Sequence, residues 1–234
     1  MCGIWGYQFV ESEPPFKHSL TSRAILTTLL MCEMEERGRD SWGFAIRTPQ
    51  LSPDAPDGIA VIKDVGPCTK YVDPQIVASC LQVAAHTRKA TAGAVCKANA
   101  HPFQVKHIVG MHNGSVSNHR WLNTKYKRSC DVDSEHIFHH LAAGLDTNEL
   151  GAYGAAVWID TTDPDTVHLL RSTAGQLTVR SINKVGDTDV AGVAWCSTDN
   201  ALERALALAG YESTKFLLVS EKHYTIQRGV VKEV

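Results

Sequence analysis

The alternation of hydrophobic and polar positions divides the first part of the chain into short strands and one helix. Residues 4–10 (IWGYQFV) predict a strand that begins almost at the first residue, so we expect the terminus to lie in a sheet. Residues 20–37 carry apolar side chains at the i, i+1, i+4, i+5 spacing of a helix with one buried face, which Gly38 ends. Strands are predicted at 43–48 and 58–65, joined by the turn LSPDAPDG.

The middle of the chain predicts two apolar strands and a second helix. The segments 80–86 (CLQVAAH) and 108–114 (IVGMHNG) are strand-like, and both end in polar clusters. Asp133 or Ser134 is expected to cap the helix that follows. The apolar face of this helix comprises Ile137, Phe138, Leu141, Ala142 and Leu145.

The last part of the chain predicts a run of strands, one helix and a hairpin. The strands are YGAAVWID, TVHLLRS, LTVRSI and AGVAWCS. Residues 197–200 are expected to cap a helix that ends at Gly210, and KFLLVS with HYTIQR is expected to form a hairpin. This order of elements favours antiparallel sheets with segregated helices over a βαβ alternation. Because no repeat or linker divides the sequence, we expect residues 1–234 to form one domain.

The composition is that of an ordinary soluble protein, with 44% hydrophobic and 21% charged residues. The net charge is −2 and no long basic run is present, which argues against a nucleic-acid binder. The apolar runs are too short to span a membrane, and the N-terminus lacks the pattern of a signal peptide. We therefore expect a cytoplasmic protein that binds neither nucleic acid nor membrane.

Cysteine and histidine residues do not follow a familiar metal-binding pattern. The seven cysteines are an odd number without a CxxC pair, which favours reduced thiols over disulfides or a structural zinc site. His136, His139 and His140 stand at helical spacing, but no HExxH motif or cysteine knuckle accompanies them. We expect no metal site.

Cys2 directly follows the initiator Met1, and its side chain is small enough for Met1 to be removed. Cys2 would then carry a free α-amine, whose ordinary pKa is about 7.7 to 8.0, beside a thiol whose ordinary pKa is about 8.5. An amine and a thiol on one residue form a nucleophile with its own base. The alternative is that Cys2 is a small buried residue at the start of a strand.

Four polar clusters follow this N-terminal CGI. They are RGRDSWG at 37–43, HTRKATAG at 86–93 with NAHP at 99–102, HNGS at 112–115 and VDSEH at 132–136. In this order and spacing the chain resembles the class II glutamine amidotransferases, and the late STDNALERAL resembles their stand-alone branch. The resemblance implies an α+β fold, the four-layer αββα sandwich of the N-terminal-nucleophile hydrolases, with two stacked antiparallel sheets flanked by helices.

The resemblance also implies how a glutamine side-chain amide would be cleaved. Cys2 would attack the amide, while the Asn113 side chain and the Gly114 backbone N–H would hold the oxyanion, where one lost donor typically costs about 10²- to 10³-fold in rate. The alternative for HNG is a hairpin turn, because Asn-Gly is a strong type I′ signal.

The resemblance further implies the residues that hold the substrate. Arg88 would bind the glutamine carboxylate and Asp133 its ammonium group, as a planar cation and an anion can. Thr91 would lie at the pocket edge with His101 beside it. The alternatives are a surface arginine, a plain helix N-cap and a structural histidine.

Arg37 and Asp40 match the family loop that packs near the nucleophile, so we expect them to hold the Cys2 region. Lys89 stands where the glucosamine-forming members have a tryptophan that closes the pocket, so their gating is not expected here. The resemblance implies no cofactor.

Three hypotheses for function follow. The first is a glutaminase that feeds ammonia to a separate synthetase, since the chain ends with this domain. The second is a hydrolase of γ-glutamyl amides other than glutamine. The third is a binding module that keeps the fold without catalysis.

Overall fold

The computed structural model describes residues 1–10, 17–47 and 58–234, which form two antiparallel sheets. The seven-stranded sheet has the order β11-β9-β10-β1-β4-β2-β3. Its strands are β1 (Gly3–Phe9), β2 (Ser41–Arg47), β3 (Ile59–Val65), β4 (Gln82–Arg88), β9 (Thr178–Val185), β10 (Thr188–Cys196) and β11 (Tyr211–Phe216). The six-stranded sheet has the order β13-β12-β8-β7-β6-β5. Its strands are β5 (Phe103–Val105), β6 (Ile108–Val116), β7 (Ala152–Asp160), β8 (Thr166–Arg171), β12 (His223–Gln227) and β13 (Val230–Glu233).

The helices lie outside the two sheets. They are α1 (Lys17–Glu35), α2 (Cys68–Tyr71), α3 (Pro74–Ala78), α4 (His119–Tyr126), α5 (Glu135–Ala143), the 3₁₀ helix η1 (Thr147–Leu150) and α6 (Asp199–Leu208). Among the described residues, no helix has both the length and the apolar character that a membrane crossing requires.

The two-residue period of β1 explains how one strand serves two cores. Trp5 and Tyr7 face the helices and pack with α1 and α6, whereas Ile4 faces the core between the two sheets. A third core lies between the outer face of the six-stranded sheet and helices α4 and α5, around Phe138. All of β1 is buried, because it has a layer on each side.

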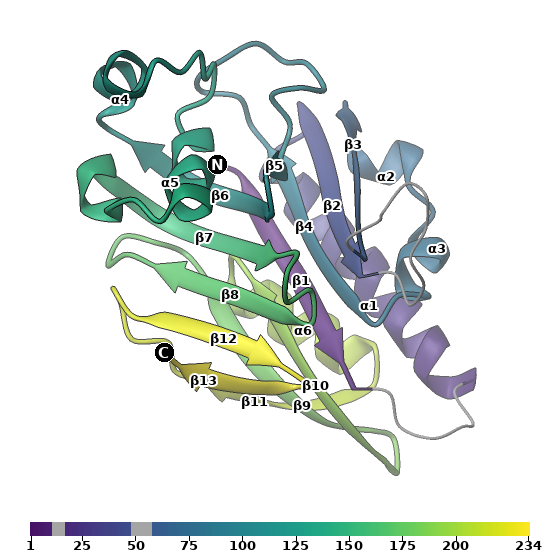
Figure 1. Cartoon of the computed structure of the whole chain (residues 1–234). Coiled ribbons are helices and arrows are strands. Elements are labelled where there is room, and N and C mark those ends of the chain that lie inside the picture. Colours follow the sequence, from purple (N-terminus) through teal and green to yellow (C-terminus); the bar gives the residue numbers. More distant parts are fainter. Residues whose placement is uncertain (11–16, 48–57) are drawn as a thin grey trace.

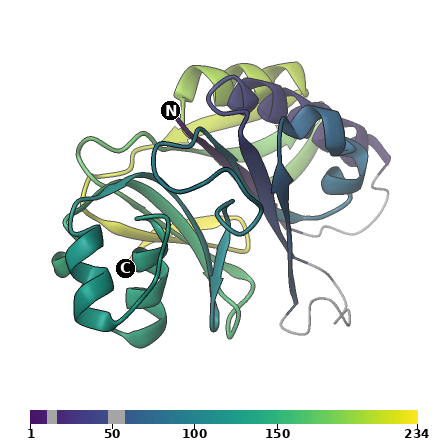
Figure 2. The same cartoon turned by 90° about the horizontal axis from the view of Figure 1, so that it is seen from above.

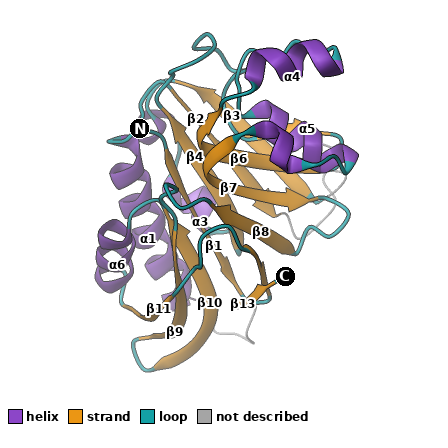
Figure 3. Cartoon of the chain, turned by 90° about the vertical axis from the view of Figure 1, so that its left-hand side faces the viewer, coloured by secondary structure: helices purple, strands orange, loops and turns teal. Residues whose placement is uncertain are grey.

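These cores produce four layers in the order helices, sheet, sheet, helices. Figure 1 shows the two sheets crossing, with α1 and α6 behind one of them. Figures 2 and 3 show α1 and α6 on one side of the sandwich and α4 and α5 on the other. The αββα sandwich expected from the sequence is therefore confirmed.

The predicted strands at 4–10, 43–48, 58–65 and 108–114 are present, each within a few residues of its expected ends. The segment 80–86 also becomes a strand, two residues later than expected. The predicted turn at 51–58 falls almost entirely outside the described residues, so it stays a prediction.

The predicted C-terminal hairpin is wrong. Only Lys215 and Phe216 of KFLLVS belong to a strand, the end of β11 in the seven-stranded sheet, whereas HYTIQR forms β12 of the other sheet. The hairpin that forms joins β12 to β13 through Arg228 and Gly229, whose φ angles are 49° and 70°. A two-residue type I′ loop requires positive φ at both residues. The C-terminal hairpin is therefore made by β12 and β13, not by the two segments expected from the sequence.

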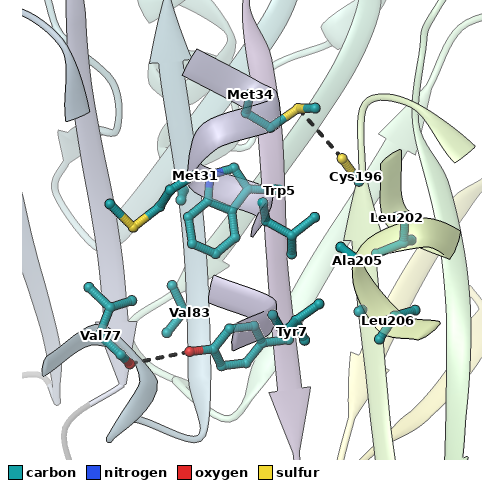
Figure 4. Close-up of a cluster of buried hydrophobic side chains, with 14 of the residues drawn as sticks. Trp5, Tyr7, Met31, Met34, Val77, Val83, Cys196, Leu202, Ala205 and Leu206 are labelled. Carbon is teal, nitrogen blue, oxygen red and sulfur yellow. Dashed lines mark hydrogen bonds between the residues drawn. The ribbon is translucent and has the colours of Figure 1, made fainter. Parts of the chain in front are cut away.

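The core between α1, α6 and the seven-stranded sheet supports a stability prediction (Figure 4). Leu206 of α6 is fully buried in this core, while Leu208 on the same helix is 63% exposed. We expect Leu206→Ala to lower the free energy of unfolding by about 2–5 kcal/mol, because it leaves a cavity. We expect Leu208→Ala to change it by less than about 0.5 kcal/mol.

Urea unfolding of both variants tests this difference, since each loses the same atoms from the same helix. Equal midpoints for the two variants would contradict the packing of α6 described above.

Candidate active site

The end of β1 brings Cys2 to the edge of the seven-stranded sheet. β1 is paired on both sides, with β10 and β4, and Gly3 lies opposite Thr87. The Ile4 N–H also donates to Ser197 Oγ at 2.9 Å. Because its neighbours are held in this way, Cys2 occupies a fixed place beside the end of β4.

Cys2 contacts residues from three other parts of the chain. The Lys89 N–H donates to Cys2 Sγ at 3.4 Å, and Sγ lies 3.6 Å from the Lys89 carbonyl oxygen. The Cys2 carbonyl oxygen accepts from Arg37 Nε and from Asn113 Nδ2, each at 2.8 Å. Two of the expected site residues therefore touch the candidate nucleophile directly.

Electrostatics at Cys2 act in opposite directions. Burial raises the pKa of the thiol above its ordinary value. The Lys89 N–H, the positive charge of the chain N-terminus, Arg88 and Arg37 each pull this pKa down in part. The thiol is thus kept protonated at neutral pH, and a nearby base is needed to activate it.

Asn113 and Gly114 lie within β6, opposite Ala155 and Gly154 of β7. The HNG motif is therefore part of a continuous strand, and the alternative of a type I′ turn is wrong. A Cβ atom on Gly114 would collide with the Tyr153 carbonyl oxygen, so the close approach of the two backbones requires glycine there.

His112 precedes Asn113 and fixes this part of β6. Its Nε2 lies 3.1 Å from the Tyr153 carbonyl oxygen and its Nδ1 lies 2.9 Å from Ser134 Oγ. A carbonyl only accepts, so Nε2 carries the proton and Nδ1 accepts from the serine hydroxyl. Burial lowers the pKa of His112 to about 4, so the ring is neutral at physiological pH.

Arg88 and Asp40 hold the loop that follows β4. The buried Arg88 guanidinium donates to the carbonyl oxygens of Ala92 and Ala94. Asp40 Oδ2 accepts from the Ala90 N–H at 2.7 Å, and the Asp40 N–H donates to the Arg88 carbonyl oxygen at 3.0 Å. Thr91, on the same loop, is exposed.

Asp133 is half-buried just before α5, and its Oδ2 accepts from the Val116 N–H at 2.6 Å. The N-cap position belongs to Ser134, yet neither side chain caps the helix by a hydrogen bond. The expected capping bond is therefore wrong, because Ser134 pairs with His112 and Asp133 with the end of β6.

His101 is buried next to His86 of β4. It is 3% exposed, and its ring centre lies 4.1 Å from that of His86 and 4.7 Å from that of Phe103. Neither ring nitrogen has a hydrogen-bond partner within the described ranges. Burial, together with the neighbouring cationic and histidine groups, lowers the pKa of His101 well below its ordinary value.

Three residues near the site were not expected from the sequence. Gln176 Oε1 accepts from Arg37 Nη2 at 2.7 Å, Ser197 anchors β1, and Ser134 anchors His112. Ser134 lies inside the VDSEH motif, which could have suggested a role. No sequence pattern singles out Gln176.

The fold and these contacts define a class of protein. Cys2 precedes a central strand of an αββα sandwich, and its carbonyl oxygen accepts from a side-chain amide, so the class has to combine this fold with a cysteine at the strand start. The sequence model described as "Glutamine amidotransferases class-II" matches residues 26–164. The chain therefore belongs to the class II glutamine amidotransferases.

Curated proteins with similar sequences have names that fit this family. A glutamine–fructose-6-phosphate aminotransferase (isomerizing) of Pseudomonas syringae pv. tomato is 40% identical over 193 residues, which cover 74% of this chain and 29% of the relative. Its counterpart in Escherichia coli K12 is 29% identical over 200 residues, with the same two coverages. The chain thus corresponds to under a third of the length of these curated relatives.

Two solved structures share the fold. The allosteric regulatory enzyme of purine biosynthesis has a TM-score of 0.65 at 17% identity, covering all of this chain and 48% of the other. A glutamine aminotransferase class-II domain protein from Silicibacter pomeroyi has a TM-score of 0.52 at 16% identity, covering 100% of this chain and 98% of the other.

Proposed function

We propose that Cys2, once Met1 is removed, hydrolyses the side-chain amide of glutamine and releases ammonia. The observation that carries this proposal is the 2.8 Å contact between Asn113 Nδ2 and the Cys2 carbonyl oxygen. It sets an amide donor beside the residue whose thiol attacks. The amide group has two N–H bonds and this contact uses one, so the other is available to a substrate oxygen.

The reaction has two halves. The α-amine of Cys2 takes the thiol proton, and the thiolate forms a C–S bond with the amide carbon. The carbonyl electron pair moves onto oxygen, which the Asn113 side chain and the Gly114 N–H stabilise. Collapse of this oxyanion breaks the C–N bond, and ammonia leaves with a proton from the α-amine of Cys2. Water then hydrolyses the γ-glutamyl thioester, which yields glutamate and restores the thiol.

The two charged groups of glutamine match Arg88 and Asp133, and two further residues line the pocket. Arg88 binds the glutamine carboxylate, and its charge already acts on the Cys2 thiol. Asp133, a half-buried carboxylate, binds the ammonium group. Thr91 lies at the pocket edge, and His101 supports the pocket from beneath.

The names of the curated relatives describe transfer of an amino group from glutamine, which favours glutamine as the donor here. Residues 1–234 act as one glutaminase domain, and the ammonia passes to a synthetase on a separate protein. Glutaminase activity that rises when the synthetase is added would support the proposal that the two reactions take place on two separate proteins.

Covalent labelling tests the proposal. We expect the intact mass of the purified protein to lack Met1 and, after incubation with a diazo-ketone analogue of glutamine, to gain one adduct. Peptide mapping should place the adduct on Cys2, and excess glutamine should block it. The Cys32→Ser variant should label like the parent, because Cys32 is exposed on α1.

Retained Met1, or an adduct elsewhere, would overturn the proposal. An adduct on Cys2 that glutamine does not block would instead favour a γ-glutamyl amide other than glutamine as the substrate.

A further inference from the structure

Three side chains with metal-binding atoms meet at the start of α5. Cys130 lies in the loop before this helix, while Glu135 and His139 stand one turn apart on it. One ligand atom from each residue lies within 4.8 Å of the others. This cluster belongs to the start of α5, in the helical layer that α4 and α5 form over the six-stranded sheet (Figures 1 and 3).

The distance between the His139 imidazole and the Glu135 carboxylate is close to that between two ligands of one metal ion. His139 Nε2 lies 3.6 Å from Glu135 Oε1. Two ligands about 2.0–2.2 Å from a tetrahedral zinc ion are separated by roughly 3.4 Å. An ion could thus sit between the imidazole and the carboxylate with side-chain movements of a few tenths of an ångström.

The cysteine is held in place by its backbone. The Cys130 N–H donates to Asn123 Oδ1, and its carbonyl oxygen accepts from Asn123 Nδ2, each at 3.0 Å. The same carbonyl accepts from His119 Nε2 at 2.8 Å. Because α4 supplies both partners, the backbone of Cys130 is held in place before any ion arrives, which lowers the entropic cost of binding.

The cluster is buried on the side of Cys130 and open to solvent on the side of Glu135 and His139. Cys130 is 7% exposed, whereas the side chains of Glu135 and His139 are about a third exposed, at 28% and 31%. His136 Nδ1 lies 4.0 Å from Cys130 Sγ, but it faces Arg128 Nη1 at 3.3 Å. The fourth position is therefore suited to water.

We infer that Cys130, Glu135 and His139 form a site for a divalent transition-metal ion, with zinc as the best match. A thiolate, an imidazole and a carboxylate are ligands that zinc and cobalt accept, whereas magnesium and calcium prefer oxygen alone. Binding displaces the proton of the Cys130 thiol to solvent. Asp133 lies in the segment between Cys130 and Glu135, so the ion would stiffen the segment that carries it.

Metal titration of the full chain tests this site. After removal of metals with a chelator, we expect the protein to bind one zinc ion per chain in competition with a chromophoric chelator. Cobalt should give the absorption of a tetrahedral ion with a thiolate ligand. Cys130→Ser and His139→Gln should each weaken binding by at least about 100-fold, since each removes one of three ligands.

Two control variants separate this site from other chelating groups. Cys2→Ser should retain full binding, although an N-terminal cysteine can itself hold metal. His107→Gln, which alters a partly exposed histidine elsewhere, should also leave binding unchanged. Because His139 is partly exposed, His139→Gln keeps the test valid even if Cys130→Ser does not fold.

The inference fails if the parent binds less than one ion per chain, if His139→Gln binds as tightly as the parent, or if Cys2→Ser abolishes binding. Each of these results is independent of glutamine hydrolysis, so the site can fail while the proposed function stands.

Discussion

Replacing Cys2 by alanine is expected to lower the rate of glutamine hydrolysis by roughly 10⁴- to 10⁶-fold, the cost of losing a covalent nucleophile. Alanine is as small as cysteine, so Met1 is still removed and the α-amine is kept. The variant therefore loses only the thiol, which contacts Lys89, and keeps the backbone carbonyl oxygen that accepts from Asn113. Release of glutamate at saturating glutamine measures the effect.

Cys32→Ala is the matched control, because Cys32 is an exposed thiol on α1. Its rate should equal that of the parent, and both variants should keep the thermal midpoint of the parent. A Cys2→Ala protein that turns over glutamine at the parental rate would mean that another group is the nucleophile.

The order of motifs in the sequence predicted which distant residues lie together. Arg37 and Asn113 stand 35 and 111 positions from Cys2, yet both donate to its carbonyl oxygen. No local rule connects residues so far apart, and only the resemblance to a family placed them in one site. The fold class followed in the same way, with the strand pattern in agreement.

Local patterns failed where tertiary contacts decide the outcome. Ser134 occupies an N-cap position, but its hydroxyl is used by His112, which belongs to another layer. KFLLVS and HYTIQR are neighbours in the sequence, but β11 and β12 join different sheets, and this crossing depends on the packing of the two sheets rather than on a local pattern. Cys130 was one of seven scattered cysteines until the fold set it beside Glu135 and His139.

Removing the Asn113 amide is expected to lower kcat for glutamine by about 10²- to 10³-fold, with a smaller change in KM. The amide stabilises charge that develops on the substrate oxygen only in the transition state, so its loss affects the chemical step most. Asn113→Ala removes the donor, and Asn113→Asp should be slower still because a carboxylate repels the oxyanion. Steady-state kinetics of both variants measures kcat and KM separately and so tests whether kcat changes more than KM.

Asn113 also donates to the Cys2 carbonyl oxygen, so a purely structural role has to be distinguished from an electrostatic one. Alkylation of Cys2 by iodoacetamide forms no oxyanion, and its rate reports only the position and reactivity of the thiol. If Asn113→Ala keeps the parental alkylation rate while kcat falls, the amide acts on the transition state. If both rates fall together, its contribution is to hold Cys2. Asn183→Ala, an exposed strand asparagine that pairs with Thr214, should change neither rate.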